Sequence, residues 1–197
     1  SVADNIDSQL NQINNLREQI YINKNIRSFH FEDNPLDALN MISALREYTL
    51  TNSFVDDIYV LYNEEKFLFS SKTSVNSRYF FENKYICNAL GIEIGDRQGF
   101  FNAFSSNSDK YFKLPKASLS STSYDDGGEQ VIMHAYADYK ENNVKQIIFF
   151  TILETKFTEM MNSTDMLSNA NNIILNENND IIMAMPAHGP FDVANFS

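Results

Sequence analysis

The chain has 197 residues, of which 43% are hydrophobic and 13% aromatic, and it carries a formal net charge of −11. This length and composition are enough for one domain, or one domain and a fraction, with a real hydrophobic core. The acidic balance argues against a nucleic-acid groove and against docking on anionic lipid, because both require clustered Lys and Arg.

Cys87 is the only cysteine, which excludes an internal disulfide and a Cys-based zinc site. Its neighbours are mostly apolar and indicate a buried structural thiol. No stretch approaches the ~18 apolar residues of a membrane span. The longest strongly apolar run covers residues 147–153. No signal peptide is visible. The chain begins inside a helical pattern and ends in a loose segment, which is typical of a piece excised from a longer protein.

The first 28 residues have the periodicity of a long helix. Apolar side chains recur every three or four positions, at Val2, Ile6, Leu10, Ile13, Leu16 and Ile20. The stripe is narrow, and two interpretations stay open. The helix either covers the chain's own core, or it is a signalling stalk that also pairs in a homodimer. A second helix is expected from Asn34-Pro35, where Asn can cap and Pro fits the first turn, to about Thr51.

Residues 52–71 are predicted to form a β-hairpin. Its strands cover residues 54–62 and 66–71, around a polar turn at 63–65. Both faces of the first strand are apolar after Asp57, so we expect a central strand that is covered on both sides. Asp56 and Asp57 are neighbours on a strand and therefore point to opposite faces. This arrangement is poor for an acid–base pair and favours a structural role at the start of the strand.

The middle of the chain, residues 72–128, is irregular and rich in aromatic residues. It predicts one or two short helices, a Phe100, Phe101 and Phe104 cluster, a short strand at 111–114 and a polar loop at 118–128. Two strong strands at 129–139 and 144–153 then form a second hairpin. A short helix at 156–162 and a third hairpin, 172–175 with 181–184, complete the order of elements.

Three stretches resemble the Cache domain, the PAS-like extracytoplasmic sensor module of bacterial membrane receptors. They are IDSQLNQINNL (6–16), TNSFVDDIYVLY (51–62) and NNIILNENNDIIMA (171–184). The sequence is most similar to the sensor regions of membrane-bound AraC-type regulators and related sensor histidine kinases of Gram-positive bacteria.

The resemblance implies an α+β fold with a PAS-like (Cache) central antiparallel sheet, helices on both faces and a long N-terminal helix. Residues 1–154 would be the distal, ligand-sensing lobe. Residues 155–197 would be a linker helix and part of a membrane-proximal lobe. The domain would face the outside of the cell, with the membrane reached only through flanking helices that lie outside these residues.

Strand alternation indicates where a ligand could bind. On the 129–139 strand, one face carries Val131, Met133, Ala135 and Ala137, and the other carries Ile132, His134, Tyr136 and Asp138. Three polar groups on one face of a central strand need partners. We therefore expect His134, Tyr136 and Asp138 to line a pocket with Arg78, Tyr79 and Tyr85 from the middle segment. The alternative is a partly solvated face whose residues pair only locally.

A charged ligand would need a counter-charge, for which Arg78 and Arg97 are the basic residues in the right segment. The amino-acid-binding signature of some Cache domains is not evident, so no such ligand is assigned.

The sequence offers no catalytic or metal-binding motif. His30, His134 and His188 lack partners at metal-ligand spacing, and the Asp125-Asp126-Gly127-Gly128 run lacks the alternating oxygen ligands of an EF-hand. Gly91, Gly95 and Gly99 do not form a phosphate loop, and no G-x-S-x-G motif is present. We expect neither an enzyme nor a cofactor.

Three functions remain for comparison. The favoured one is a small-molecule sensor of a transmembrane signalling protein, most similar to an AraC-type regulator, with a histidine kinase or chemoreceptor as the alternative. The second is a ligand-free adhesion or assembly module, and the least favoured is a small hydrolase. The expected partners are a small ligand and, through the N-terminal helix, a second copy of the chain, but no nucleic acid.

Overall fold

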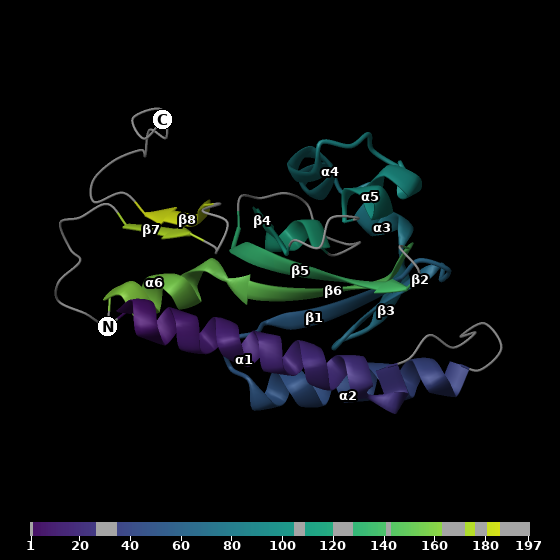
Figure 1. Cartoon of the computed structure of the whole chain (residues 1–197), viewed down its shortest axis with the longest axis horizontal. Coiled ribbons are helices and arrows are strands. Elements are labelled where there is room, and N and C mark those ends of the chain that lie inside the picture. Colours follow the sequence, from purple (N-terminus) through teal and green to yellow (C-terminus); the bar gives the residue numbers. More distant parts are fainter. Residues whose placement is uncertain are drawn as a thin grey trace.

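The computed structural model describes residues 2–26, 35–104, 109–119, 128–140, 143–162, 172–175 and 181–185. Its centre is a six-stranded antiparallel sheet with the strand order β3-β2-β1-β6-β5-β4 (Figure 1). The strands are β1 (Asp57–Tyr62), β2 (Phe67–Ser70), β3 (Ser74–Asn76), β4 (Lys110–Pro115), β5 (Gln130–Lys140) and β6 (Asn143–Leu153). A separate two-stranded sheet pairs β7 (Asn172–Leu175) with β8 (Ile181–Met185).

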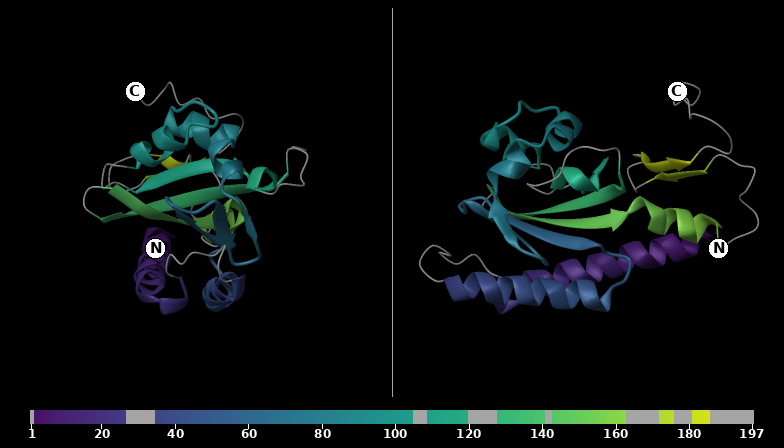
Figure 2. Two further views of the ribbon diagram at one scale, coloured as in Figure 1. Left: turned by 90° about the vertical axis from the view of Figure 1, so that its right-hand side faces the viewer. Right: turned by 180° about the vertical axis from the view of Figure 1, so that it is seen from behind.

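Helices cover both faces of the six-stranded sheet. α1 (Val2–Ile22) and α2 (Pro35–Thr51) lie side by side under one face, and α3 (Arg78–Phe81), α4 (Lys84–Leu90) and α5 (Arg97–Ala103) lie over the other (Figures 1 and 2). α6 (Glu154–Asn162) follows β6 directly. Two short 3₁₀ helices, η1 (Lys24–Ile26) and η2 (Lys116–Leu119), complete these elements. None of the described helices combines the length and apolar composition of a membrane span.

This architecture confirms the predicted fold class: an α+β fold with a PAS-like central antiparallel sheet, helices on both faces and a long N-terminal helix. Two boundaries differ from prediction by more than two residues. α1 ends at Ile22, before η1, and β1 begins at Asp57 instead of residue 54. Phe54 is nevertheless buried and packs edge-to-face on Phe157, with ring centroids 5.2 Å apart. The short edge strand β3 was not predicted, and the middle segment forms three helices.

The sheet separates two hydrophobic cores. The first lies under α1 and α2 and takes Ile6, Ile13, Leu16 and Ile20 from α1. This burial confirms that the α1 stripe covers the chain's own core; pairing in a homodimer stays a prediction. The second core lies under α3, α4 and α5 and includes the predicted Phe100, Phe101 and Phe104 cluster. Cys87 is fully buried, as expected for a structural thiol, and burial raises its pKa.

α6 belongs to the first core by its contacts. Phe157 is fully buried in the cluster that holds the α1 stripe. α6 therefore packs with elements that lie before residue 154, in the part of the chain that was predicted to form the distal lobe. The division of the chain into two lobes stays a prediction, because much of residues 155–197 lies outside the described residues.

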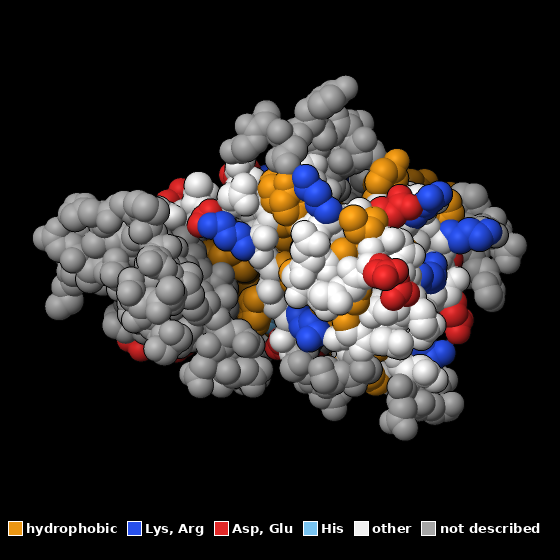
Figure 3. All heavy atoms as spheres, turned by 90° about the horizontal axis from the view of Figure 1, so that it is seen from above, with side chains coloured by type: hydrophobic (Ala, Val, Ile, Leu, Met, Phe, Trp, Pro, Cys, Tyr) orange, Lys and Arg blue, Asp and Glu red, His pale blue; other side chains and the backbone are white. Residues whose placement is uncertain are grey.

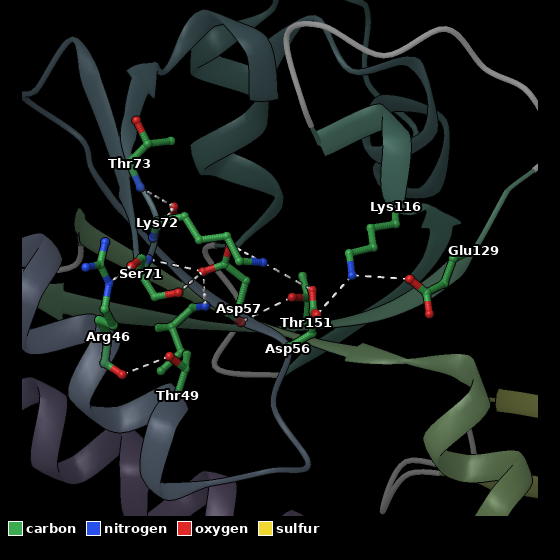
Figure 4. A network of polar contacts seen from close by, with 12 residues as sticks. Arg46, Thr49, Asp56, Asp57, Ser71, Lys72, Thr73, Lys116, Glu129 and Thr151 are labelled. Atoms are coloured by element: carbon green, nitrogen blue, oxygen red, sulfur yellow. Dashed lines mark hydrogen bonds and ion pairs between the residues drawn. The ribbon is translucent and has the colours of Figure 1, made fainter.

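A polar network fixes the start of β1 (Figure 4). The buried Asp57 carboxylate accepts hydrogen bonds from the Ser71 hydroxyl at 2.5 Å, the Ser71 N–H at 3.1 Å and the Ile58 N–H at 2.8 Å. Lys72 Nζ lies 3.4 Å from the same carboxylate. Arg46 of α2 donates to the Ser71 carbonyl at 3.2 Å, so the network also joins α2 to the hairpin. The predicted structural role of Asp57 agrees with this geometry.

Asp56 has a different environment from its neighbour. Its carboxylate forms ion pairs with Lys116 at 3.0 Å and Lys72 at 3.6 Å, and 18% of its side chain is exposed. Lys116 also pairs with Glu129 at 3.2 Å (Figure 4). These pairs are partly solvated and are expected to contribute less than the buried hydrogen bonds of Asp57.

We expect Asp57→Ala to lower the free energy of unfolding by about 3 kcal/mol, because it removes the carboxylate that accepts from the Ser71 hydroxyl and the Ile58 N–H. Asp56→Ala, the matched control, should cost about 1 kcal/mol or less. Urea unfolding of both variants measures the difference. Equal losses would show that the buried hydrogen bonds of Asp57 do not determine the stability of this end of β1.

Candidate functional site

A cleft of about 220 Å³ lies between α1 and the neighbouring strands β5 and β6; we call it the α1 cleft. Its lining combines charged, polar, aromatic and aliphatic side chains: Arg17, Glu18, Tyr21, Tyr136, Ala137, Asp138, Gln146 and Ile148. One wall is thus a helix and the other is the centre of the sheet.

The strand wall follows from alternation and register. Tyr136 and Asp138 point to the α1 face of β5, as the sequence predicted. In the antiparallel pairing with β6, Tyr136 lies opposite Ile148 and Asp138 lies opposite Gln146. Gln146 is buried although its side chain is polar. Two adjacent strands therefore bring a carboxylate and an amide together at one point.

The helix wall comes from positions beside the α1 apolar stripe. Arg17 and Tyr21 are four residues apart and so lie on the same side of the helix. Tyr21 is 54% exposed, whereas Arg17 extends over the ring of Tyr136 with its guanidinium carbon 4.8 Å from the ring centroid. The Arg17 guanidinium also pairs with Glu18 at 2.8 Å.

Polar contacts hold α1 against β5 at the cleft. The Tyr136 hydroxyl donates a hydrogen bond of 2.8 Å to Asn14 Oδ1, and Arg17 lies over the Tyr136 ring as described. Net contributions of about 1 kcal/mol each are typical of such contacts. The position of α1 therefore depends on a small number of polar contacts in addition to its apolar stripe.

Beneath Tyr136 lies the buried histidine of the same strand face. The His134 ring stacks on Tyr111 with centroids 3.9 Å apart and planes at 20°. Its Nδ1 is 3.0 Å from the Tyr136 hydroxyl. Its Nε2 makes no hydrogen bond to the described part of the chain but lies 3.4 Å from a carboxylate oxygen of Asp109, close enough for an ion pair when the ring is protonated.

The charge of His134 is set by opposing effects. Burial disfavours the imidazolium and lowers the pKa, the carboxylate of Asp109 raises it, and the positive charge of Arg17 lowers it again. Burial outweighs Asp109, so the net pKa of His134 lies below its ordinary value of 6.5. His134 is thus a core residue whose ring is uncharged at neutral pH. It packs against Tyr136, which lines the cleft.

The structure divides the six predicted ligand residues between the two faces of the sheet. His134, Tyr136 and Asp138 lie on the α1 face, and the last two line the α1 cleft. Arg78, Tyr79 and Tyr85 lie on α3 and α4, over the opposite face. The expectation that all six line one pocket is therefore corrected, because the sheet separates the two sets.

The residues on α3 and α4 are engaged locally or exposed. Arg78 pairs with Glu82 at 2.6 Å, Tyr79 is 52% exposed, and Tyr85 carries Lys84 over its ring at 4.9 Å. Arg78 lines a cleft of about 350 Å³ together with Arg97, and Arg78 and Tyr79 line another of about 250 Å³; both are larger than the α1 cleft but more open to solvent. Figure 3 views this side, where apolar patches are small and are interrupted by charges of both signs.

Arg97, the other predicted counter-charge, has a structural role. Its guanidinium donates to the backbone carbonyls of Asn63 and Glu65 and lies over the rings of Phe81 and Phe101. Burial lowers its pKa. Arg97 thus joins α5 to the β1–β2 turn.

Aromatic side chains fill the space between α3, α4, α5 and the sheet. Phe149 of β6 contacts Phe80, Phe100 and Phe104, with ring centroids 5.2, 6.5 and 6.2 Å apart. All four rings are at most 2% exposed. This packing explains why the polar residues of α3 and α4 point to the rim instead of to the centre of the sheet.

The sequence did not single out Arg17, Glu18, Tyr21 and Gln146. The i, i+4 spacing of Arg17 and Tyr21 beside an apolar stripe was a usable signal, since it places a cation and an aromatic ring next to the buried side of the helix. No sequence signal showed which end of which strand the helix would cover. Among the described residues, no group of His, Cys, Asp and Glu is arranged to hold a metal ion.

No family model matches the sequence, and no curated protein matches it. Among solved structures, the chain is similar to the sensory domain of the Campylobacter jejuni chemoreceptor Tlp3 (CcmL). The match covers 93% of this chain and 68% of that chain, with 14% sequence identity and a TM-score of 0.42. A likeness at this level transfers no residue roles to this chain.

We expect His134 to make the stability pH-dependent. Because its folded-state pKa lies below the unfolded value, the unfolded chain binds a proton first as the pH falls below 6.5. Relative to His134→Gln, the protein should therefore lose up to about 1.4 kcal/mol of unfolding free energy per pH unit in this window.

Urea titrations at a series of pH values measure this difference. Asp109→Asn removes the carboxylate that raises the pKa of His134, so it should extend the loss to lower pH. A difference between the protein and His134→Gln that stays constant below pH 6.5 would contradict the lowered pKa.

Proposed function

We propose that this chain is the extracytoplasmic small-molecule-sensing domain of a bacterial transmembrane signalling protein, and that the α1 cleft is its ligand site. The observation that carries the proposal is the construction of the cleft: one wall is α1 and the other is the central pair of strands. A ligand that contacts both walls binds most tightly at one position of the helix. Its binding therefore shifts the population of conformations toward that position of α1.

Two further features support the proposal. The stretches at residues 6–16 and 51–62 resemble Cache sensors, and the first of them lies in α1 itself. α1 has 21 residues and a length of about 31 Å, so a tilt or shift at the cleft extends to its far end. The polar contacts across the interface are few, so a modest ligand binding energy can change their balance.

The output of the receptor is the finer part of the proposal. The sequence resemblance favours an AraC-type transcriptional regulator. A chemoreceptor, the class of the structural neighbour, or a histidine kinase is the alternative. In each case the domain would lie outside the cell membrane and act by binding rather than by catalysis. The sequence of the full-length protein distinguishes these outputs, through a DNA-binding, kinase or chemoreceptor signalling domain beyond the sensor.

A ligand-free adhesion or assembly module is the second candidate. Its acidic surface would contact a partner, and the α1 cleft would have no occupant. The polar lining of the cleft favours the sensor, because Asp138 and Gln146 are removed from full solvation by the fold. Burial of such groups costs free energy unless a partner compensates them.

We expect at least one compound in a panel of amines, organic acids, sugars and amino acids to raise the melting temperature. At a concentration 100-fold above its Kd, a ligand adds about 2.7 kcal/mol, or roughly 5–10 °C for a chain of this size. Tyr21→Ala should remove most of this shift. Tyr79→Ala replaces an equally exposed tyrosine on the other side of the sheet and should leave it intact.

The two tyrosine variants make the assay specific for the cleft. Both change an exposed aromatic side chain, so neither should alter the core. A panel without any stabilising compound would favour the adhesion module. A shift that is lost in Tyr79→Ala and kept in Tyr21→Ala would move the ligand site to the α3 side.

A further inference from the structure

Asp138 is a partly buried carboxylate without a cationic partner among the described residues. The Tyr139 backbone N–H supports it, and burial raises its pKa. Other carboxylates around the sheet have a lysine within ion-pair distance, at 2.6 to 3.5 Å: Glu154 with Lys113, Asp56 with Lys116, and Glu64 with Lys145. Asp138 differs from them because it lines the α1 cleft.

Arg17, the cation in the lining of the cleft, is already engaged. Its guanidinium pairs with Glu18 at 2.8 Å and lies over the ring of Tyr136. With Arg17 neutralised in this way, the remaining charge in the cleft is the Asp138 carboxylate. The net charge of −11 adds a field that draws cations to the protein.

The groups around Asp138 suit a protonated amine. Gln146 lies directly opposite Asp138 on β6, so a carboxylate and an amide oxygen can accept N–H bonds from one ammonium group. Tyr21, Tyr136 and Ile148 supply aromatic and aliphatic surface for the rest of a ligand. Pairing with an ammonium would also compensate the desolvation of the carboxylate.

We infer that the ligand of the α1 cleft is a small molecule with a protonated amine on an apolar body, whose ammonium group pairs with Asp138 and Gln146. This inference rests on the proposed function, because it names the class of ligand for the same site. It goes further by assigning the sign of the charge and the residue that recognises it.

Three compounds with the same aromatic body and different charge test the inference. They are 2-phenylethylamine, which is cationic, 2-phenylethanol, which is neutral, and 3-phenylpropanoate, which is anionic. Titration of the ¹⁵N-labelled chain by NMR gives a Kd for each compound and maps the contact to the amides of Tyr21, Asp138 and Gln146. We expect the amine to bind about tenfold or more tightly than the alcohol, and the carboxylate to bind most weakly.

Asp138→Asn keeps the size of the side chain and one acceptor oxygen, and it removes the charge. It should weaken binding of the amine by about tenfold and leave the Kd of the alcohol unchanged, so that the two compounds bind with similar affinity. Glu93→Gln is the matched control: it removes one exposed carboxylate on the α3–α5 side, and it should preserve the preference for the amine.

The outcomes separate the inference from the proposed function. Equal binding of the three compounds in the cleft, or a preference for the amine that survives Asp138→Asn, overturns the inference and keeps the cleft as the site. A compound that has no amine, raises the melting temperature and loses this effect in Tyr21→Ala would also overturn the inference and keep the cleft as the site. If neither these compounds nor the wider panel bind in the cleft, the proposed function fails together with the inference.

Discussion

The rest of the structure depends on the position of β6 at the centre of the sheet. This strand pairs with β1 on one side and with β5 on the other, although β1 lies more than 80 residues earlier in the chain. Its inward side chains on both faces are buried, from Ile147 to Ile152. A strand buried in this way must have both backbone edges paired, because an unpaired N–H or C=O in the interior costs as much as a lost hydrogen bond. Once β6 is in place, the two cores and the helices that cover them follow.

The two faces of β6 lead to different chemistry. Phe149 faces α3, α4 and α5, where phenylalanine rings occupy the space above the sheet. Gln146 and Ile148 face α1, beside the polar groups of β5. Aromatic packing gives a rigid layer on the first side, since such rings interlock at close to crystal density. The second side keeps a cleft, because its polar side chains need hydrogen-bonding partners that apolar packing cannot supply.

α1 is therefore held in two ways. Its apolar stripe gives affinity for the sheet, and Asn14 and Arg17 give it a specific position over Tyr136. The hydrophobic effect is non-directional, so the stripe alone tolerates a small displacement of the helix better than the hydrogen bond does. A ligand beside these contacts competes with them or reinforces them. The proposed sensing function and the proposed preference for an amine both follow from this local arrangement.

Sequence periodicity by itself determined most of the fold. The α1 stripe, the strands around residues 57–62, 130–140 and 143–153, and the face of β5 that carries His134, Tyr136 and Asp138 all follow from local patterns of 3.6 or two residues. Only the tertiary structure decided what covers each face. It placed α1 over Tyr136 and Asp138, and it placed Arg78, Tyr79 and Tyr85 beyond the sheet. The physical reason is that periodicity states on which side of an element a residue lies, whereas the neighbour on that side is set by long-range strand pairing, which leaves no local trace in the chain.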